Sequence, residues 1–283
     1  MDWERCSMAF TVKLAQYADM AECARVEYES MPNYPGYLSD AWHYFQSQKG
    51  ACVCVYDEEK MIGIGRFTVL PDGTGWLETL RVSIPHQGKG AGKAIYRKYR
   101  ELAEEYGCPS MAMFTGVSNV ISSGLAEKNG LRTAATHRGY HLTDLTGGCA
   151  HHFRPVNPQR AAELALPMKD EYNNHMVFNR TFFHVNDANI RCFAAEGKVF
   201  EDSEDGSYIV CGARFQHHAA LHIAMMGGDY DRCIDFAVNH ARAMGVGKVS
   251  CTFTLDNEKL ENALKARGFK PDASDLITKE IVF

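Results

Sequence analysis

The sequence lacks any apolar run long enough to cross a membrane. Its longest apolar runs, such as Leu221 to Met226, fall far short of the roughly 18 to 20 residues that a spanning helix needs. The first residues also lack the basic segment and apolar stretch of a secretion signal. We therefore expect a cytoplasmic protein with no membrane partner.

An excess of positive charge is absent as well. The 30 lysines and arginines stand against 35 aspartates and glutamates, which gives a net charge of -5. Such a chain has no global field that would draw it onto a phosphate backbone. We expect no nucleic-acid partner.

The ten cysteines include no Cys-x-x-Cys pair. Scattered cysteines in apolar surroundings are typical of reduced core thiols rather than of a disulfide framework or a zinc site. His218 and His222 lie four residues apart, and His151 and His152 are adjacent. The segment 219–226 has the pattern of a strand, in which residues four apart lie about 13 Å apart. We therefore expect no metal.

The length of 283 residues suits two domains, because domains cluster at about 100 to 150 residues. Apolar residues make up 46% and charged residues 23% of the chain, as in ordinary soluble globular proteins. In the first half, the patterns predict an α/β (α+β) fold with a mixed, mostly antiparallel sheet flanked by helices. The predicted elements are a strand at 9–14, a helix at 20–26, an aromatic loop that leads into a short helix over 31–45, and strands at 51–56, 61–69 and 75–82.

A glycine-rich loop, Gln87–Gly92, follows the last of these strands and precedes a helix. The helix carries an apolar stripe at Ile95, Tyr99, Leu102 and Tyr106. Backbone N–H groups and the positive end of the helix dipole at such a loop bind a diphosphate. The loop is neither a Walker loop nor a dinucleotide fingerprint, and a plain glycine-rich turn is the alternative.

Three motifs occur in a fixed order: Leu77–Val82, then Gln87-x-x-Gly90-x-Gly92, then Asn119-x-x-Ser122-x-x-Leu125 with Gly130 after it. Over residues 8 to about 145 this order resembles the GNAT superfamily of acyl-CoA-dependent N-acyltransferases. The resemblance implies acetyl-CoA as co-substrate and no metal. The residues that it implies for acetyl-CoA binding are Leu80, Arg81, Val82, Gln87, Gly88, Lys89, Gly90, Ala91, Gly92, Lys93, Asn119 and Ser122.

The two halves of the chain repeat. Gly107, Asn119 and Gly130 are followed 138 residues later by Gly245, Asn257 and Gly268. A repeat at this scale predicts two tandem GNAT-like domains: a catalytic domain at 1–147, a linker at 148–170 and a second domain at 171–283. The second domain is expected to be degenerate. Its loop at 225–231 has fewer glycines and two aspartates, whose charge opposes a diphosphate.

Amide formation from a thioester needs a base, a polarised carbonyl and a proton for the departing thiolate. The resemblance implies that Glu78 is the base and that a bulged backbone at 80–82 binds the pantetheine arm and the thioester oxygen. The alternative is that Glu78 faces solvent or pairs with an arginine.

The tyrosine that usually serves as acid in the family is replaced by Ala126. Tyr140 is the catalytic substitute that we predict. Two further candidates for the proton donor are its neighbour His141 and Tyr96. A thiolate can also leave without help.

The acceptor is expected to be a compact amine, either an amino acid or an aromatic amine, that attacks directly in a ternary complex. Glu27, Tyr34 and Tyr37 are the predicted acceptor-binding residues, and packing of the aromatic loop onto the core is the alternative. The segment 75–82 is faintly similar to amino-acid acetyltransferases of the histidine N-acetyltransferase type. Two other functions stay open: a non-catalytic acyl-CoA sensor and a protein N-terminal or lysine acetyltransferase. Apolar edge strands also make a homodimer possible.

Overall fold

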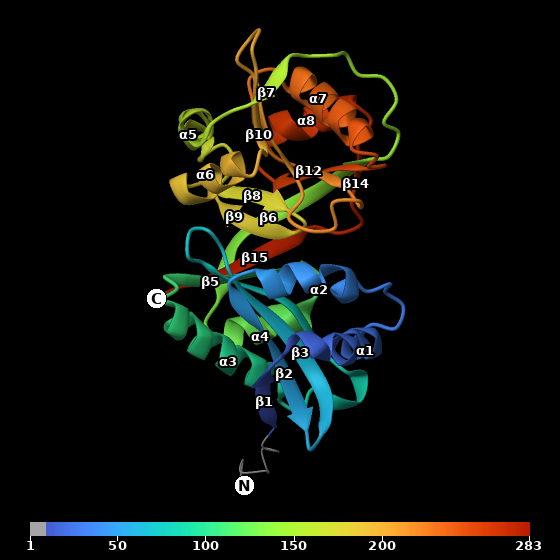
Figure 1. The fold of residues 1–283 in the computed structure, drawn as a ribbon, viewed down its shortest axis with the longest axis vertical. Coiled ribbons are helices and arrows are strands. Elements are labelled where there is room, and N and C mark those ends of the chain that lie inside the picture. Colours follow the sequence, from blue (N-terminus) through green and yellow to red (C-terminus); the bar gives the residue numbers. More distant parts are fainter. Residues whose placement is uncertain (1–9) are drawn as a thin grey trace. The chain divides into compact units, whose positions relative to one another are not determined.

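The computed structural model describes residues 10–283, which form two compact units (Figure 1). Unit 1 comprises the described residues up to Met113 together with Ile121–Arg132 and Glu280–Phe283. Unit 2 comprises Phe114–Val120 and Thr133–Lys279. The two units exchange short segments, so no single cut of the chain separates them. The predicted boundaries at 147 and 171 stay a prediction, and residues 1–9, where the first domain and strand were expected to begin, lie outside the described residues.

Unit 1 is built on a sheet whose strands follow the chain order. Strands β1 to β4 pair antiparallel, and β5 joins β4 in parallel. The predicted meander is therefore confirmed, including the tight hairpin at Asp57–Lys60. The strands are β1 (Thr11–Leu14), β2 (Gly50–Asp57), β3 (Lys60–Val69), β4 (Gly75–Val82) and β5 (Ser110–Gly116).

Helices cover both faces of this sheet. Successive side chains on a strand point to opposite faces. On β3, the ring of Phe67 lies 6.0 Å from that of Tyr99 in α3, whereas the Arg66 guanidinium lies 5.8 Å from the Phe45 ring in α2. α3 and α2 therefore lie on opposite faces. The helices are α1 (Met20–Ser30), α2 (Leu38–Ser47), α3 (Ala91–Tyr106) and α4 (Val120–Lys128), with short 3₁₀ turns at Tyr17–Asp19 and Ile84–His86.

The predicted apolar stripe of α3 packs on the sheet. Ile95, Tyr99 and Leu102 are fully buried. The helix lies so close to β3 that a Cβ on Gly65 would come within 2.0 Å of the Tyr99 hydroxyl. Gly107 ends the helix in the left-handed region, with a φ of +66°, as expected for a glycine in that position.

In unit 2 the strand order is β6-β13-β12-β11-β10-β7. β12 and β13 are parallel, and the other described pairs are antiparallel. Its strands are β6 (Arg132–Leu142), β7 (Phe153–Pro155), β10 (Val199–Asp202), β11 (Tyr208–Gly212), β12 (Leu221–Gly227) and β13 (Val249–Thr254), with β14 (Lys270–Pro271) also on β6 and β15 (Leu276–Val282) at the C-terminal end.

The remaining elements of unit 2 are a separate antiparallel hairpin of β8 (His175–Phe178) and β9 (Thr181–His184), a short 3₁₀ turn at Leu166–Met168, and helices α5 (Pro158–Ala165), α6 (Asp187–Ala195), α7 (Tyr230–Ala243) and α8 (Glu258–Ala266). The helix predicted in the linker region is α5. No helix within residues 10–283 is long and apolar enough to cross a membrane.

The internal repeat is visible in the order of the elements. The series β4, α3, β5, α4 in the first half corresponds to β12, α7, β13, α8 in the second. Each series contains one parallel strand pair. The offset of 138 residues relates α4 to α8 at both ends. The structure thus confirms a mixed α/β fold built on a tandem repeat.

Candidate active site

The glycine loop holds the start of α3 in an open conformation. Gly88 and Gly90 have φ values of +76° and +104°, which residues with a side chain rarely adopt. Gly90 occupies the N-cap, and no side chain caps the helix there. The first N–H groups of a helix have no partner within it. The loop therefore offers backbone donors and the positive end of the helix dipole to an anion.

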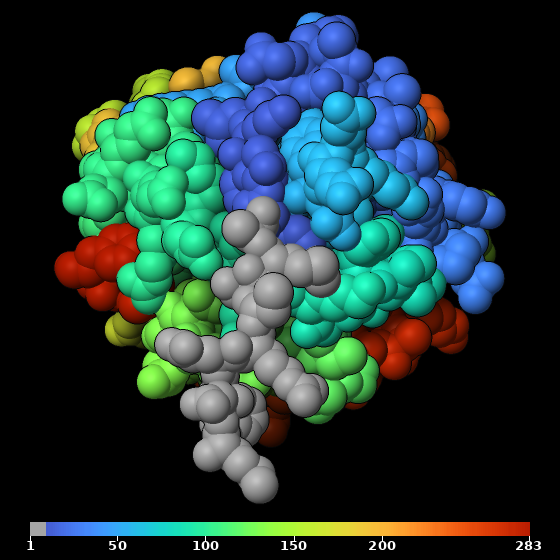
Figure 2. All heavy atoms as spheres, turned by 90° about the horizontal axis from the view of Figure 1, so that it is seen from below, coloured from blue at the N-terminus to red at the C-terminus, as the bar shows by residue number. Residues whose placement is uncertain are grey.

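Lys89 and Lys93 are exposed on this loop and on the first turn of α3. In Figure 2, the teal spheres on the surface belong to the part of unit 1 that includes this loop. The Gln87 side chain donates a 3.0 Å hydrogen bond to the carbonyl oxygen of Val82, which ties the loop to the end of β4. At Gly92, the second residue of α3, a Cβ would come within 2.9 Å of Leu125 in α4. The predicted residue Ser122 lies on the same α4, and Asn119 precedes it in a segment assigned to unit 2.

Strand β4 is bulged immediately before the loop. Its register with β3 shifts between Ile64 and Arg66, and Thr79 has a φ of +58°, which is unusual for a residue with a branched side chain. The described pairing with β5 covers only Gly75–Leu77. This geometry confirms the predicted bulge, and the binding role expected of residues 80–82 stays a prediction.

Glu78 lies just before the bulge and is buried, with 7% of its surface exposed. The Thr68 hydroxyl donates a 2.7 Å hydrogen bond to Glu78 Oε1. Arg66 Nε in turn donates a 3.0 Å hydrogen bond to the Thr68 oxygen. Because the Thr68 oxygen accepts from Arg66, its single proton is directed at Glu78. The role of Glu78 as base stays a prediction.

The predicted acceptor residues lie together on unit 1. Glu27, Tyr34 and Tyr37 line one hollow of about 160 Å³. The Tyr37 hydroxyl lies 2.8 Å from Thr79 Oγ1 at the bulge, so this side chain connects the hollow with β4. Burial is the main cause that raises the pKa of Tyr37 to about 12; the Arg81 guanidinium opposes the rise and Glu78 adds to it. Tyr37 therefore keeps its proton at neutral pH.

The candidates for the proton donor lie in different surroundings. Ala126, at the position of the usual tyrosine, is buried in the core of unit 1 with Tyr96. Burial raises the pKa of Tyr96 well above its usual value. Tyr140 lies on β6 in unit 2 and donates a 2.7 Å hydrogen bond to Glu261, and His141 lies 2.8 Å from Asp272. The catalytic role of Tyr140 stays a prediction.

In the second repeat, a side chain caps the start of α7, unlike the start of α3 in the first repeat. Asp229 is the N-cap of α7, and its carboxylate accepts hydrogen bonds from the backbone N–H groups of Asp231 and Arg232. The donors that would face a diphosphate are therefore already used by a negative side chain. This is the arrangement expected of a degenerate second domain.

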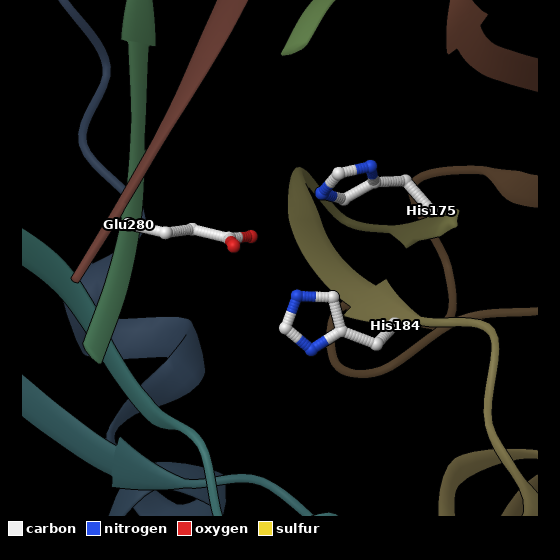
Figure 3. A group of neighbouring side chains, drawn as sticks. All are labelled: His175, His184 and Glu280. Carbon is white, nitrogen blue, oxygen red and sulfur yellow. The ribbon is translucent and has the colours of Figure 1, made fainter. Parts of the chain in front are cut away.

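The histidines considered for a metal are separated in structure. His222 lies on β12, and His218 lies in the turn before it. Another pair, His175 and His184, occupies opposite positions on the β8–β9 hairpin, with ring centroids 5.7 Å apart (Figure 3). Glu280, also drawn there, belongs to unit 1. Nine cysteines of the described residues have free thiols, and Cys6 lies outside those residues.

Sequence reasoning missed Thr68, Thr79 and Arg66, which surround Glu78 and Tyr37. Arg66 and Thr68 lie two apart on β3 and therefore share a face. The register places Arg66 directly opposite Glu78. The register of the hairpin between β3 and β4 would have predicted that these residues lie beside Glu78.

Comparisons with known proteins agree with this geometry. Residues 17–131 match the acetyltransferase (GNAT) family. An uncharacterized N-acetyltransferase of Bacillus subtilis (strain 168), YobR, is 31% identical over 83 residues, which are 29% of this chain and 33% of that protein. The match thus spans about a third of that relative's length.

Solved structures resemble the whole chain in fold. A putative acetyltransferase from Pyrococcus horikoshii has a TM-score of 0.68 at 11% identity and covers 100% of this chain and 92% of its own. A tandem GNAT protein from the clavulanic acid biosynthesis pathway has a TM-score of 0.65 at 12% identity, over 96% of this chain and 98% of its own. The match to the acetyltransferase (GNAT) family thus covers residues 17–131, and the whole chain has the fold of a tandem GNAT protein.

Proposed function

We propose that this protein transfers an acetyl group from acetyl-CoA, the acyl donor of the family, to the amine of a small molecule, and that unit 1 carries out the reaction. The observation that carries this proposal is the bulged β4 that leads directly into the uncapped, glycine-lined start of α3. The donor's diphosphate would lie at that helix start, and its pantetheine arm would lie along residues 80–82.

The reaction is a direct attack in a ternary complex. Glu78 accepts a proton from the acceptor's ammonium group, and the neutral nitrogen attacks the thioester carbon. A backbone N–H of the bulge stabilises the negative charge that develops on the carbonyl oxygen. The nitrogen–carbon bond forms and the carbon–sulfur bond breaks. The nitrogen loses a second proton as it becomes an amide, and this proton goes to the departing thiolate or to solvent, while Glu78 returns its proton to solvent. A thiolate with a pKa near 8.5 can leave unaided, and the catalytic role predicted for Tyr140, which lies in unit 2, stays a prediction.

The acceptor is proposed to be a compact amine, an amino acid or an aromatic amine, bound at Glu27, Tyr34 and Tyr37. The hollow that these residues line supports this, because its size suits a small group rather than a peptide segment. A location in the cytoplasm and a homodimer remain proposals that rest on the sequence alone.

The test is to incubate the pure protein with acetyl-CoA and a panel of amines, amino acids and peptides while a thiol reagent records release of free CoA. Release with small amines, and none with peptides, supports the proposal. Release with peptides alone would instead support a protein acetyltransferase. Binding of acetyl-CoA without release in any mixture would support the second candidate, a sensor without turnover, which the replacement of the usual tyrosine by Ala126 favours.

A further inference from the structure

Glu27, which lines the hollow, has hydrogen-bond partners on only one of its two carboxylate oxygens among the described residues. Glu27 on α1 is buried, with 4% of its surface exposed. Its Oε2 accepts the backbone N–H groups of Tyr37 at 3.1 Å and Leu38 at 2.9 Å. Its Oε1 is buried and has no hydrogen-bond partner among the described residues. A buried carboxylate oxygen without a donor is costly, so a ligand that supplies one gains binding energy.

The surroundings of Glu27 favour a cation as that ligand. The same hollow is lined by Tyr28, Tyr34, Tyr37 and Asp40. Tyrosine faces attract ammonium and guanidinium groups, and Asp40 adds a second acidic side chain. The volume of about 160 Å³ leaves room for several non-hydrogen atoms, since a cavity needs only about 10–15 Å³ of this measure to hold one water molecule. An alkylammonium or guanidinium group therefore fits, whereas an anion would meet like charge.

Tyr37 contacts both Glu27 in the hollow and Thr79 on β4. Its backbone N–H binds Glu27, and its hydroxyl reaches Thr79, the residue that follows Glu78 on β4. The two buried carboxylates, Glu27 and Glu78, are thus placed near opposite ends of one tyrosine side chain.

The two carboxylates suit different tasks. An amine must lose its proton before it attacks a thioester. A buried carboxylate that receives a direct hydrogen bond from an ammonium group stabilises the protonated form. Glu78 lies beside the bulge of β4 and already accepts a hydrogen bond from Thr68, whereas Glu27 Oε1 has no donor among the described residues. The reacting amine therefore belongs near Glu78, and the cation held at Glu27 is another group.

We propose that the acceptor carries a second positive charge, an ammonium or guanidinium group that binds Glu27 while the reacting amine faces Glu78. This inference rests on the proposed function and narrows its substrate class to diamines and related dications. A neutral or purely aromatic monoamine would leave Glu27 Oε1 without a donor.

The test is calorimetric titration of the full chain, without acetyl-CoA, with 1,4-diaminobutane and with 1-aminobutane as the monoamine of equal length. Glu27→Gln removes the charge but keeps an amide oxygen for the N–H groups of Tyr37 and Leu38. Glu22→Gln is the matched control, because Glu22 lies on the same helix, is exposed and does not line the hollow. Tyr34→Ala is a second variant at an exposed side chain, which the fold tolerates more easily.

We expect the diamine to bind about 10- to 100-fold more tightly than the monoamine, as a charge-assisted hydrogen bond allows. Glu27→Gln should remove that preference, Tyr34→Ala should reduce it several-fold, and Glu22→Gln should leave it unchanged. Equal binding of the two amines, no binding of either, or a preference that survives both Glu27→Gln and Tyr34→Ala would overturn the inference. A preference of this kind without CoA release from acetyl-CoA would keep the cation site and reject the proposed acetyl transfer.

Discussion

Glu78 is the residue on which the proposed chemistry depends most. Glu78→Gln keeps the shape of the side chain and its hydrogen bond from Thr68, but it removes the proton acceptor. Loss of a general base typically costs 10²- to 10⁴-fold in rate. We expect turnover at neutral pH to fall by roughly 100-fold or more, with little change in acetyl-CoA affinity, since Glu78 lies apart from the glycine loop.

Steady-state rates and acetyl-CoA titrations of the same variant separate these effects. A variant that retains most of its turnover, with an unchanged pH profile, would show that the base is elsewhere. A parallel loss of acetyl-CoA binding would show that Glu78 mainly supports the fold through Thr68 and Arg66.

His222 in unit 2 makes acid stability testable. Burial, helped by the positive charges of Lys248 and Arg180, lowers the pKa of His222 to about 4 from its usual 6.5. Between these values the unfolded chain binds a proton that the folded chain does not, so stability falls as pH falls from about 6.5 to 4. The protonation of His222 lowers the free energy of unfolding by up to about 3 kcal/mol over this interval.

Urea unfolding at pH 7 and pH 4.5 measures this loss. His222→Gln does not titrate, so the variant should lose less unfolding free energy over that interval than the natural protein does. The same loss in both proteins would mean that His222 is accessible to protons in the folded state.

At the scale of elements, α3 and β3 pack too closely for any side chain at Gly65. Gly65→Ala would place a Cβ within 2.0 Å of the Tyr99 hydroxyl, so we expect a loss of about 1–3 kcal/mol in unfolding free energy. The Tyr99 hydroxyl is itself buried without a hydrogen-bond partner among the described residues. Tyr99→Phe should therefore be neutral or stabilising.

The double variant Gly65→Ala with Tyr99→Phe is the control for this contact. It should recover part of the stability lost in Gly65→Ala, because the clashing oxygen is gone. If denaturant unfolding shows the two changes to be additive, the hydroxyl does not restrict Gly65.

Local patterns predicted the elements well. The stripe of Ile95, Tyr99 and Leu102 predicted α3 and its buried face, because helical periodicity is written in neighbouring residues. The chain of hydrogen bonds from Arg66 through Thr68 to Glu78 was not predicted, since it depends on the cross-strand register. Likewise, the unpartnered Oε1 of Glu27 follows from the path of the loop at Tyr37 and Leu38, which no periodicity fixes.

At the scale of the whole molecule, two repeats share a topology but differ at the helix start that would bind a diphosphate. In the first repeat Gly90 leaves the N–H groups of α3 uncapped by any side chain, and in the second Asp229 caps α7. The spacing of 138 residues revealed the repeat. The exchange of segments between the units was not visible in sequence, because it depends on contacts between residues far apart in the chain.

The most direct test of this account is the stoichiometry of acetyl-CoA binding, measured by calorimetry on the natural protein and on Gly90→Glu. We predict one acetyl-CoA per chain and no detectable binding to Gly90→Glu, because a carboxylate there would oppose the diphosphate sterically and by charge. A stoichiometry near two, or binding that survives Gly90→Glu, would contradict the assignment of acetyl-CoA to the glycine loop of unit 1.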